Sequence, residues 1–288
     1  MIVTGYTATE SSAAALKLAA KLAVARNETV HIVHAFDVPA VNVAMGPAVV
    51  PPSTEEVNEW CADVVAEAEQ LARDGGAPGV SSVVRLGPPA SVLVAEAGPE
   101  DLVVVGTRGR GELASVLLGS VSYQVTAHAP CPVIVVRSNC DFSNPEGAVV
   151  VGVDGSEPSA KAVEFATRWA LKSGRPLTLV AAWQNPTMVG LPGAWVYAST
   201  DDDAAAVEQA TISMMAELRD RISAEHPELS VTSQVVADDP AHALSAASAE
   251  ASLLVVGSRG HGGFVGLVLG SISHRVLHDA PVPVAVVR

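Results

Sequence analysis

The chain has 288 residues, of which 49% are hydrophobic and only 17% are charged, a balance that argues against an intrinsically disordered protein. Its net charge of −14 argues against nucleic acid and anionic membranes as partners, because both bind through a positive surface. The length suits two α/β domains of about 140 residues each, a size at which each domain can bury its own core.

Three features of the sequence bear on where the protein works. No apolar run approaches the roughly 18 residues that a membrane-spanning helix requires. The chain enters a predicted strand at Ile2, without the basic and apolar segments of a signal peptide. The odd number of cysteines and their spacing suit reduced thiols better than disulfides or a metal site, at Cys61, Cys131 and Cys140. We therefore expect a cytoplasmic protein.

Strands and helices alternate along the first half. Apolar runs predict the strands, and amphipathic spacing with capping residues predicts the helices. A capping box from Ser53 to Glu56, for example, marks the start of the second helix. The predicted elements are strand 2–6, helix 11–26, strand 30–36, helix 55–73, strand 80–86, helix 89–97, strand 102–105, helix 120–128 and strand 132–136. The proline-rich stretch 37–52 is predicted to be an irregular connection.

The second half repeats this order after a linker rich in Asn, Ser and Pro. Its predicted elements are strand 149–153, helix 159–172, strand 177–183, a long helix 201–225, strand 231–236, helix 241–250, strand 253–256, a helix starting near 271 and strand 282–287. The predicted domains are residues 1–138 and 147–288.

This alternation of elements predicts an α/β fold with two tandem parallel sheets, each covered by helices on both faces through right-handed crossovers. Such sheets bind ligands at the carboxyl ends of their strands, beside the point where the strand order reverses. We therefore expect the ends of the first, second and fourth strands of each repeat to line one crevice.

The most informative motif follows the strand at 253–256. Gly257 and Gly260 are followed, after nine residues, by Gly270-Ser271. Glycines let the backbone approach a bulky anion with open N–H groups, and the start of a helix at the second turn favours negative charge. We expect Ser271 or Ser273 to cap that helix. The motif predicts a phosphate site.

The same motif occurs in the first half, at the same spacing. Gly106, Gly109 and Gly119 correspond to the three glycines of the second half, and half of the positions from 106 to 137 match those from 257 to 288. The chain is a tandem repeat, with one anion site predicted in each half.

Other strand ends carry weaker signals. Asp154, after the first strand of repeat two, can accept hydrogen bonds from ribose hydroxyls or a base amine, or it can simply cap the next helix. Ala35 and Ala182 are small enough for an adenine to lie on the backbone, although ordinary packing explains them as well. Arg108 and Arg259 are candidate contacts to phosphates, although a loop arginine is solvated by default.

Both halves resemble universal stress protein domains. Nucleotide-binding members of that family carry Gly-x-x-Gly, nine residues and Gly-Ser/Thr, after an early strand that ends in Val-Asp-Gly-Ser. The resemblance covers nearly the whole chain except the linker. It implies five-stranded, parallel, Rossmann-like domains of the adenine nucleotide alpha hydrolase-like type, which bind ATP or AMP and pair through their last strands. In repeat two it implies that Asp154 lies by the adenosine, Ala182 meets the adenine, Val256, Gly257 and Gly260 line ribose and phosphates, and Gly270, Ser271, Ile272 and Ser273 bind phosphate.

Repeat one departs from this pattern. It has Thr7-Ala8-Thr9 where repeat two has Asp154 and its neighbours, so the carboxylate is missing. Loss of one charge-assisted hydrogen bond costs on the order of 1.5–3 kcal/mol, or about ten- to a hundredfold in affinity. We predict a weaker first site, whose candidate residues are Thr7, Ala35, Val105, Gly106, Arg108, Gly109, Gly119, Ser120, Val121 and Ser122.

Catalytic motifs are missing from the sequence: it has no nucleophile elbow, zinc-protease helix, Walker lysine or paired-cysteine site. A nucleotide held by glycine amides, without a placed base or nucleophile, is expected to be retained. The first hypothesis is a stress-response sensor or regulator that binds ATP or AMP and a protein partner. A slow ATPase or adenylate-transferring enzyme and a nucleotide-free interaction module are the alternatives. The sequence leaves open whether Mg²⁺ accompanies the phosphates and whether the intrachain pseudo-dimer forms homodimers.

Overall fold

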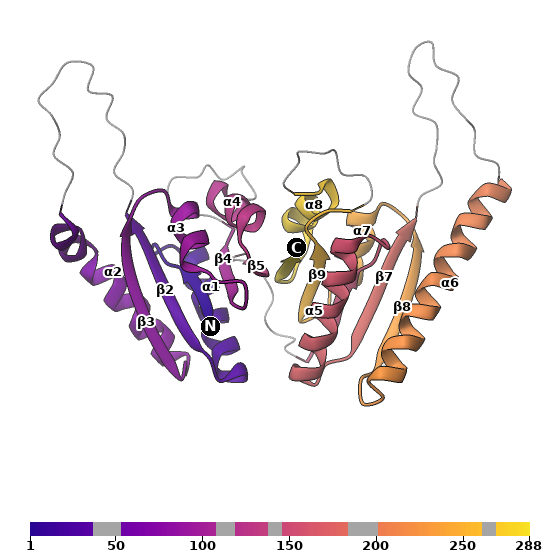
Figure 1. Ribbon diagram of the computed structural model, residues 1–288, viewed down its shortest axis with the longest axis horizontal. Coiled ribbons are helices and arrows are strands. Elements are labelled where there is room, and N and C mark those ends of the chain that lie inside the picture. Colours follow the sequence, from indigo (N-terminus) through magenta and orange to yellow (C-terminus); the bar gives the residue numbers. More distant parts are fainter. Residues whose placement is uncertain (37–52, 108–118, 138–145, 184–200, 261–268) are drawn as a thin grey trace, which may run out of the picture. The chain divides into compact units, whose positions relative to one another are not determined.

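The computed structural model describes residues 1–36, 53–107, 119–137, 146–183, 201–260 and 269–288. The chain divides into two compact units, Met1–Asn139 and Cys140–Arg288. Each unit contains a twisted sheet with helices packed on both of its faces (Figure 1).

The first unit alternates strands and helices from beginning to end. Its strands lie in the order β3-β2-β1-β4-β5, and the neighbouring strands run parallel. Helices α1 and α2 pack on one face of this sheet, and α3 and α4 pack on the other. The elements are β1 Ile2–Gly5, α1 Glu10–Arg26, β2 Thr29–Phe36, α2 Thr54–Asp74, β3 Gly79–Leu86, α3 Pro89–Glu96, β4 Leu102–Gly106, α4 Ser120–His128 and β5 Val133–Val136.

The second unit has the same topology. Its strands lie in the order β8-β7-β6-β9-β10, again parallel, with α5 and α6 on one face and α7 and α8 on the other. The elements are β6 Val149–Gly152, α5 Glu157–Ser173, β7 Leu177–Trp183, α6 Asp201–Glu225, β8 Val231–Ala237, α7 Pro240–Ala247, β9 Leu253–Gly257, α8 Ser271–Asp279 and β10 Val284–Val287.

Burial explains why the central strands read as continuous apolar runs. All five residues of β9 are buried, as are the first four of β4, because each strand lies in the middle of its sheet with helices above and below. The register aligns Val149 with both Leu177 and Leu253, so the carboxyl ends of β6, β7 and β9 come to the same edge. The strand order reverses between β6 and β9, and that edge is therefore the expected ligand position.

Side-chain caps fix the starts of four described helices, α1, α2, α5 and α7. The side chain of Ser53 accepts a hydrogen bond from the backbone N–H of Glu56, whose carboxylate in turn accepts from the N–H of Ser53, and the predicted capping box is confirmed. Thr9 forms a capping box with Ser12 at the start of α1, and the hydroxyl oxygen of Ser156 accepts from the N–H of Ser159 at the start of α5.

The predicted α/β fold class, with two tandem parallel sheets, is confirmed. The predicted pairing of the two last strands stays a prediction, and the stretch 37–52 lies outside the described residues. No described helix combines the length and the apolar character needed to cross a membrane.

Candidate functional site

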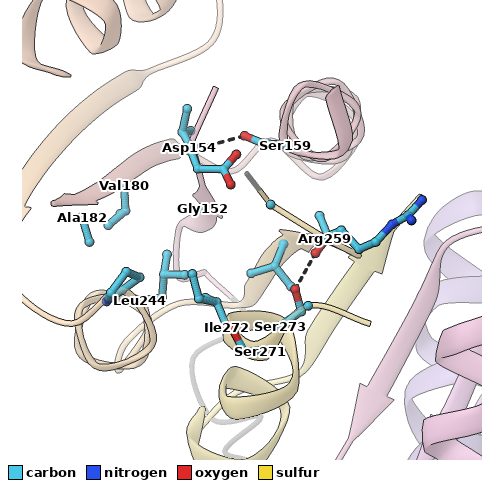
Figure 2. A pocket seen from close by; sticks show the side chains of 16 residues that line it. Gly152, Asp154, Ser159, Val180, Ala182, Leu244, Arg259, Ser271, Ile272 and Ser273 are labelled. Atoms are coloured by element: carbon cyan, nitrogen blue, oxygen red, sulfur yellow. Dashed lines mark hydrogen bonds between the residues drawn. The ribbon is translucent and has the colours of Figure 1, made fainter. Parts of the chain in front are cut away.

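A pocket of about 490 Å³ opens at the carboxyl edge of the second sheet (Figure 2). Strand ends from β6, β7 and β9 form one side of it, and the starts of α7 and α8 form the other. Its lining residues are Gly152, Val153, Asp154, Ser159, Val180, Ala182, Pro240, Leu244, Val256, Gly257, Arg259, Gly260, Gly270, Ser271, Ile272 and Ser273. All ten candidate residues of repeat two lie in this set.

One end of the pocket is apolar. Figure 2 shows Val180 and Ala182 on the end of β7 and Leu244 on α7 around this end, with Ile272 between them and the other end. The methyl group of Ala182 leaves space that a larger side chain would fill. A flat apolar group such as a purine ring suits this end.

Asp154 stands above the pocket with a fixed carboxylate. Its Oδ1 accepts hydrogen bonds from the backbone N–H of Ser156 at 2.9 Å and from the hydroxyl of Ser156 at 2.6 Å. Its Oδ2 lies so close to Gly260 that a Cβ on that residue would overlap it. Ser156, and not Asp154, caps α5, which removes the capping explanation for the carboxylate. Asp154 is exposed, and its Oδ2 lies next to Gly260, which lines the pocket.

The start of α8 forms the polar end. Its N-cap is Gly270, and the structure shows no side-chain cap there. The first helical hydrogen bond runs from the N–H of His274 to the carbonyl of Gly270 at 2.9 Å, so the amides of Ser271, Ile272 and Ser273 precede it. These amides and the positive end of the helix dipole suit an anion.

The expectation that Ser271 or Ser273 caps this helix is wrong. The hydroxyl of Ser273 is buried and donates to the carbonyl oxygen of Gly257 at 2.7 Å, which ties the helix start to the end of β9. Its proton is therefore used within the protein, and Ser273 offers a ligand its backbone N–H. Ser271 is exposed at the pocket surface.

Close packing supplies a second reason for the glycine at the end of β9. A Cβ on Gly257 would lie 2.8 Å from the backbone carbonyl carbon of Pro158 and 3.0 Å from the N atom of Ser159. The start of α5 thus crosses the strand end in direct contact with its backbone. The motif predicts Gly257 as a ligand contact, and the packing of α5 requires a glycine there as well.

Charged groups of both signs surround Arg259, which lines the pocket with Asp154. Burial lowers the pKa of Arg288, which follows β10, and the guanidinium of Arg259 lowers it further. Arg259 also contributes, after the larger effect of Lys161, to lowering the pKa of Glu157 on α5.

The first repeat reproduces the scaffold of this site with different side chains. The hydroxyl of Ser122 donates to the carbonyl of Gly106, and a Cβ on Gly106 would overlap the backbone of Ser11. The N–H of Thr7 donates to the hydroxyl oxygen of Ser12 at 3.3 Å, as the N–H of Asp154 donates to that of Ser159 at 3.2 Å, so the backbone contact is shared and only the carboxylate is missing from repeat one.

The remaining candidates of repeat one fall into two groups. Ala35 lies on β2 and Val105 on β4, while Gly119 is the N-cap of α4 and Ser120, Val121 and Ser122 form its first turn. Arg108 and Gly109 lie outside the described residues.

Sequence reasoning missed six residues of the pocket: Gly152, Val153, Ser159, Val180, Pro240 and Leu244. Four of these residues lie at the ends of β6 and β7 or at the start of α5. They line the pocket because these ends come together at one edge of the sheet. Pro240 and Leu244 come from α7, and no local sequence signal marks them, because they reach the pocket through the packing of α7 beside α8.

Few titratable groups line the pocket itself. Asp154 and Arg259 are the only ionisable side chains among its described lining residues. No group of three or more His, Cys, Asp or Glu side chains with the geometry of a metal site occurs in the part of the chain that the structure describes.

Comparison with known proteins places this architecture in one family. The profile of the universal stress protein family matches residues 1–137 and 147–288. A universal stress protein of Mycobacterium bovis is 37% identical over 297 residues, which cover 100% of this chain and 96% of that protein. A universal stress protein of Mycobacterium tuberculosis is 31% identical over 293 residues, with 100% and 96% covered.

Solved structures agree on the fold. The crystal structure of a universal stress protein from Archaeoglobus fulgidus has a TM-score of 0.72 at 21% identity, covering 100% of this chain and 97% of that one. The resemblance seen in the sequence is confirmed at the level of the family. The two matched domains and the full-length relatives show that the chain is a tandem member of the universal stress protein family.

Proposed function

We propose that the second repeat binds an adenine nucleotide, ATP or AMP, and that the protein acts as a nucleotide-dependent sensor or regulator in the stress response. One observation carries the proposal: a single pocket joins an apolar end, a fixed carboxylate and an uncapped helix start. These three features match the base, the ribose and the phosphates in that order.

The proposed binding follows from the chemistry of each end. The adenine lies against Ala182, Val180 and Leu244, where apolar surface is removed from water. Oδ2 of Asp154 accepts a hydrogen bond from a ribose hydroxyl or the base amine. The phosphates meet the amides at the start of α8, with Arg259 as a cationic neighbour.

The lining residues support retention of the nucleotide over turnover. No histidine, cysteine or lysine is among the described residues of the pocket, and the single carboxylate already has one oxygen engaged by Ser156. A general base or nucleophile near the phosphates is therefore not evident in that set. If the protein were a slow ATPase, ADP or AMP would accumulate with time in a stoichiometric mixture of protein and ATP.

The first repeat is proposed to bind the same ligand more weakly. Thr7 offers a hydroxyl where Asp154 offers a charge, and the difference of about 1.5–3 kcal/mol corresponds to about ten- to a hundredfold in affinity. We also propose that a protein partner recognises the nucleotide-bound form.

We propose that the protein works in the cytoplasm, where cysteine thiols stay reduced. Burial raises the pKa of the Cys131 thiol to about 11, so this side chain is protonated at neutral pH and has the character of an inert core residue.

The direct test is a calorimetric titration of nucleotide-free protein with ATP and with AMP. Asp154→Ala should weaken the tighter site about ten- to a hundredfold, because a charge-assisted hydrogen bond is lost. Asp220→Ala is the matched control: it removes the same charge from the exposed side of α6, and it should bind like the wild type. Equal affinities for the wild type and Asp154→Ala would overturn the assignment of the site.

A further inference from the structure

One surface ion pair joins the two helices that bound the pocket of unit 2. Nη1 of Arg275 on α8 donates to Oδ2 of Asp239 at 2.7 Å. The other oxygen of Asp239, Oδ1, accepts from the backbone N–H groups of Ala241 and His242, each at 3.1 Å. One carboxylate therefore caps α7 and ties it to α8.

The ion pair lies next to the pocket in sequence on both helices. Pro240, directly after Asp239, lines the pocket, and so does Leu244 one turn further along α7. Arg275 follows Ile272 by three residues on α8, so the two positions lie on neighbouring parts of the same helix face. A shift of α7 along α8 would change the distance between the apolar end of the pocket and the amides at the start of α8.

The contact shifts the pKa of both of its partners. The guanidinium of Arg275 is the main cause that lowers the pKa of the Asp239 carboxyl, with help from the amides of His242 and Ala241. The same contact raises the pKa of Arg275. The side chains of Asp239 and Arg275 are 32% and 53% exposed. Because solvent screens an ion pair this open, its loss should change nucleotide affinity by only a few fold.

Repeat one has no counterpart to this pair. The positions that match Asp239 and Arg275 are Pro88 and Gln124. Pro88 stands at the N-cap of α3 and makes no side-chain cap. The ion pair therefore belongs to the repeat that also carries Asp154.

We propose that Asp239 and Arg275 are positioning residues for the second site, acting as a clasp that holds α7 and α8 at the separation that the nucleotide requires. The inference rests on the proposed function, since it concerns the same pocket. The clasp adds to Asp154 as a reason for the second site to bind more tightly than the first.

The test compares ATP affinity in the full chain for the wild type, Asp239→Asn, Arg275→Gln and the double variant. Asparagine still caps a helix, so Asp239→Asn removes the charge and keeps the start of α7. Each single variant should bind ATP about threefold more weakly, and the double variant no more weakly than either single one. Arg275→Lys should recover part of the loss. Adenosine, which lacks the phosphates that meet α8, should bind all of these proteins equally.

The opposite charges of Asp239 and Arg275 distinguish the clasp from a direct electrostatic effect of Arg275 on the phosphates. If Arg275 acts only by attracting phosphates, Arg275→Gln weakens binding but Asp239→Asn strengthens it, and that result overturns the clasp. Arg168→Gln, which breaks an exposed pair with Glu164 on α5, is the matched control and should leave ATP affinity unchanged. If the wild type binds ATP and every clasp variant binds it with the same affinity, the clasp is overturned and the proposed function stands. A wild type that binds neither ATP nor AMP overturns the proposed function together with it.

Discussion

The turns that follow the first strand of each repeat share a left-handed backbone conformation at one position but carry different residues there. Ala8 has a φ of +51° and Gly155 has a φ of +83°, both in the left-handed region. A residue with a Cβ pays a steric cost of roughly 1–2 kcal/mol there, whereas glycine does not. Repeat one therefore carries backbone strain next to its candidate site that repeat two avoids.

Exchange of these two residues should change stability in opposite directions. Ala8→Gly should raise the free energy of unfolding by about 0.5–1 kcal/mol, since relief of the strain exceeds the added entropy of the unfolded chain. Gly155→Ala should lower it by about 1 kcal/mol. Urea denaturation followed by circular dichroism measures both. Changes of the same sign in the two variants would contradict the strain argument.

Two glycines of the motif in repeat two serve different purposes, and substitution can separate them. A Cβ on Gly257 meets the backbone of Pro158, which cannot move without α5, so Gly257→Ala should cost about 1–3 kcal/mol of stability. A Cβ on Gly260 meets Oδ2 of Asp154, an exposed side chain that can turn away only by weakening its hydrogen bonds to Ser156. Gly260→Ala should therefore cost less stability than Gly257→Ala, about 1 kcal/mol or less, and lower ATP affinity about tenfold or more. Thermal unfolding and ATP titration, measured side by side, test the separation, and an unstable Gly260→Ala protein would contradict it.

At the scale of elements, the contact between β1 and α2 makes unit 1 sensitive to alkaline pH. Tyr6, just after β1, is 1% exposed and donates its hydroxyl to Glu67 on α2 at 2.7 Å. Burial, with Glu67 as the second cause, raises the pKa of Tyr6 to about 12. The unfolded chain has a pKa near 10. The contribution to stability is therefore complete below about pH 10 and is lost as the pH rises through about 12.

Tyr6→Phe tests this contact. The variant should lose about 1 kcal/mol at pH 8, because the hydrogen bond to Glu67 is removed from a buried position. Its stability should then fall less steeply than that of the wild type between pH 10 and pH 12. Denaturant unfolding at a series of pH values gives both slopes, and parallel slopes would contradict the assignment.

Much of the arrangement of elements could be predicted because the signals are local. The capping box at Ser53 and the apolar runs of β4 and β9 each depend on neighbouring residues, and these predictions agree with the structure. The start of α8 near residue 271 was also predictable, but the role of Ser273 there was not. Ser273 follows the rule for a cap, but its hydroxyl donates to Gly257, sixteen positions earlier in the chain, which only the tertiary fold brings close.

The candidate site shows the same limit. Asp154, Gly260 and the residues from Gly270 to Ser273 could be named from the motif and the resemblance, and they do meet in one pocket. Pro240 and Leu244 carry no motif, and they reach the pocket because α7 packs beside α8. Residues that act through packing between helices leave no pattern in the sequence of a single repeat.

At the scale of the whole molecule, duplication has produced two units with one topology and unequal sites. Both units keep the serine that ties the helix start to the strand-end glycine. The second unit alone has the carboxylate at Asp154 and the ion pair between Asp239 and Arg275. We therefore predict that ATP titrates the chain in two steps, separated by at least about tenfold in affinity. A titration that fits two equal sites would contradict this asymmetry.

The most direct measurement is to denature the purified protein and to identify and count the nucleotide that it releases. The account predicts an adenine nucleotide near one equivalent per chain for the wild type. Gly260→Ala should lose it, and Thr7→Ala, the change in the weaker repeat, should retain it. A wild-type protein that releases no nucleotide, and takes up none when ATP is added, would contradict the account and would leave a nucleotide-free interaction module as the function of this chain.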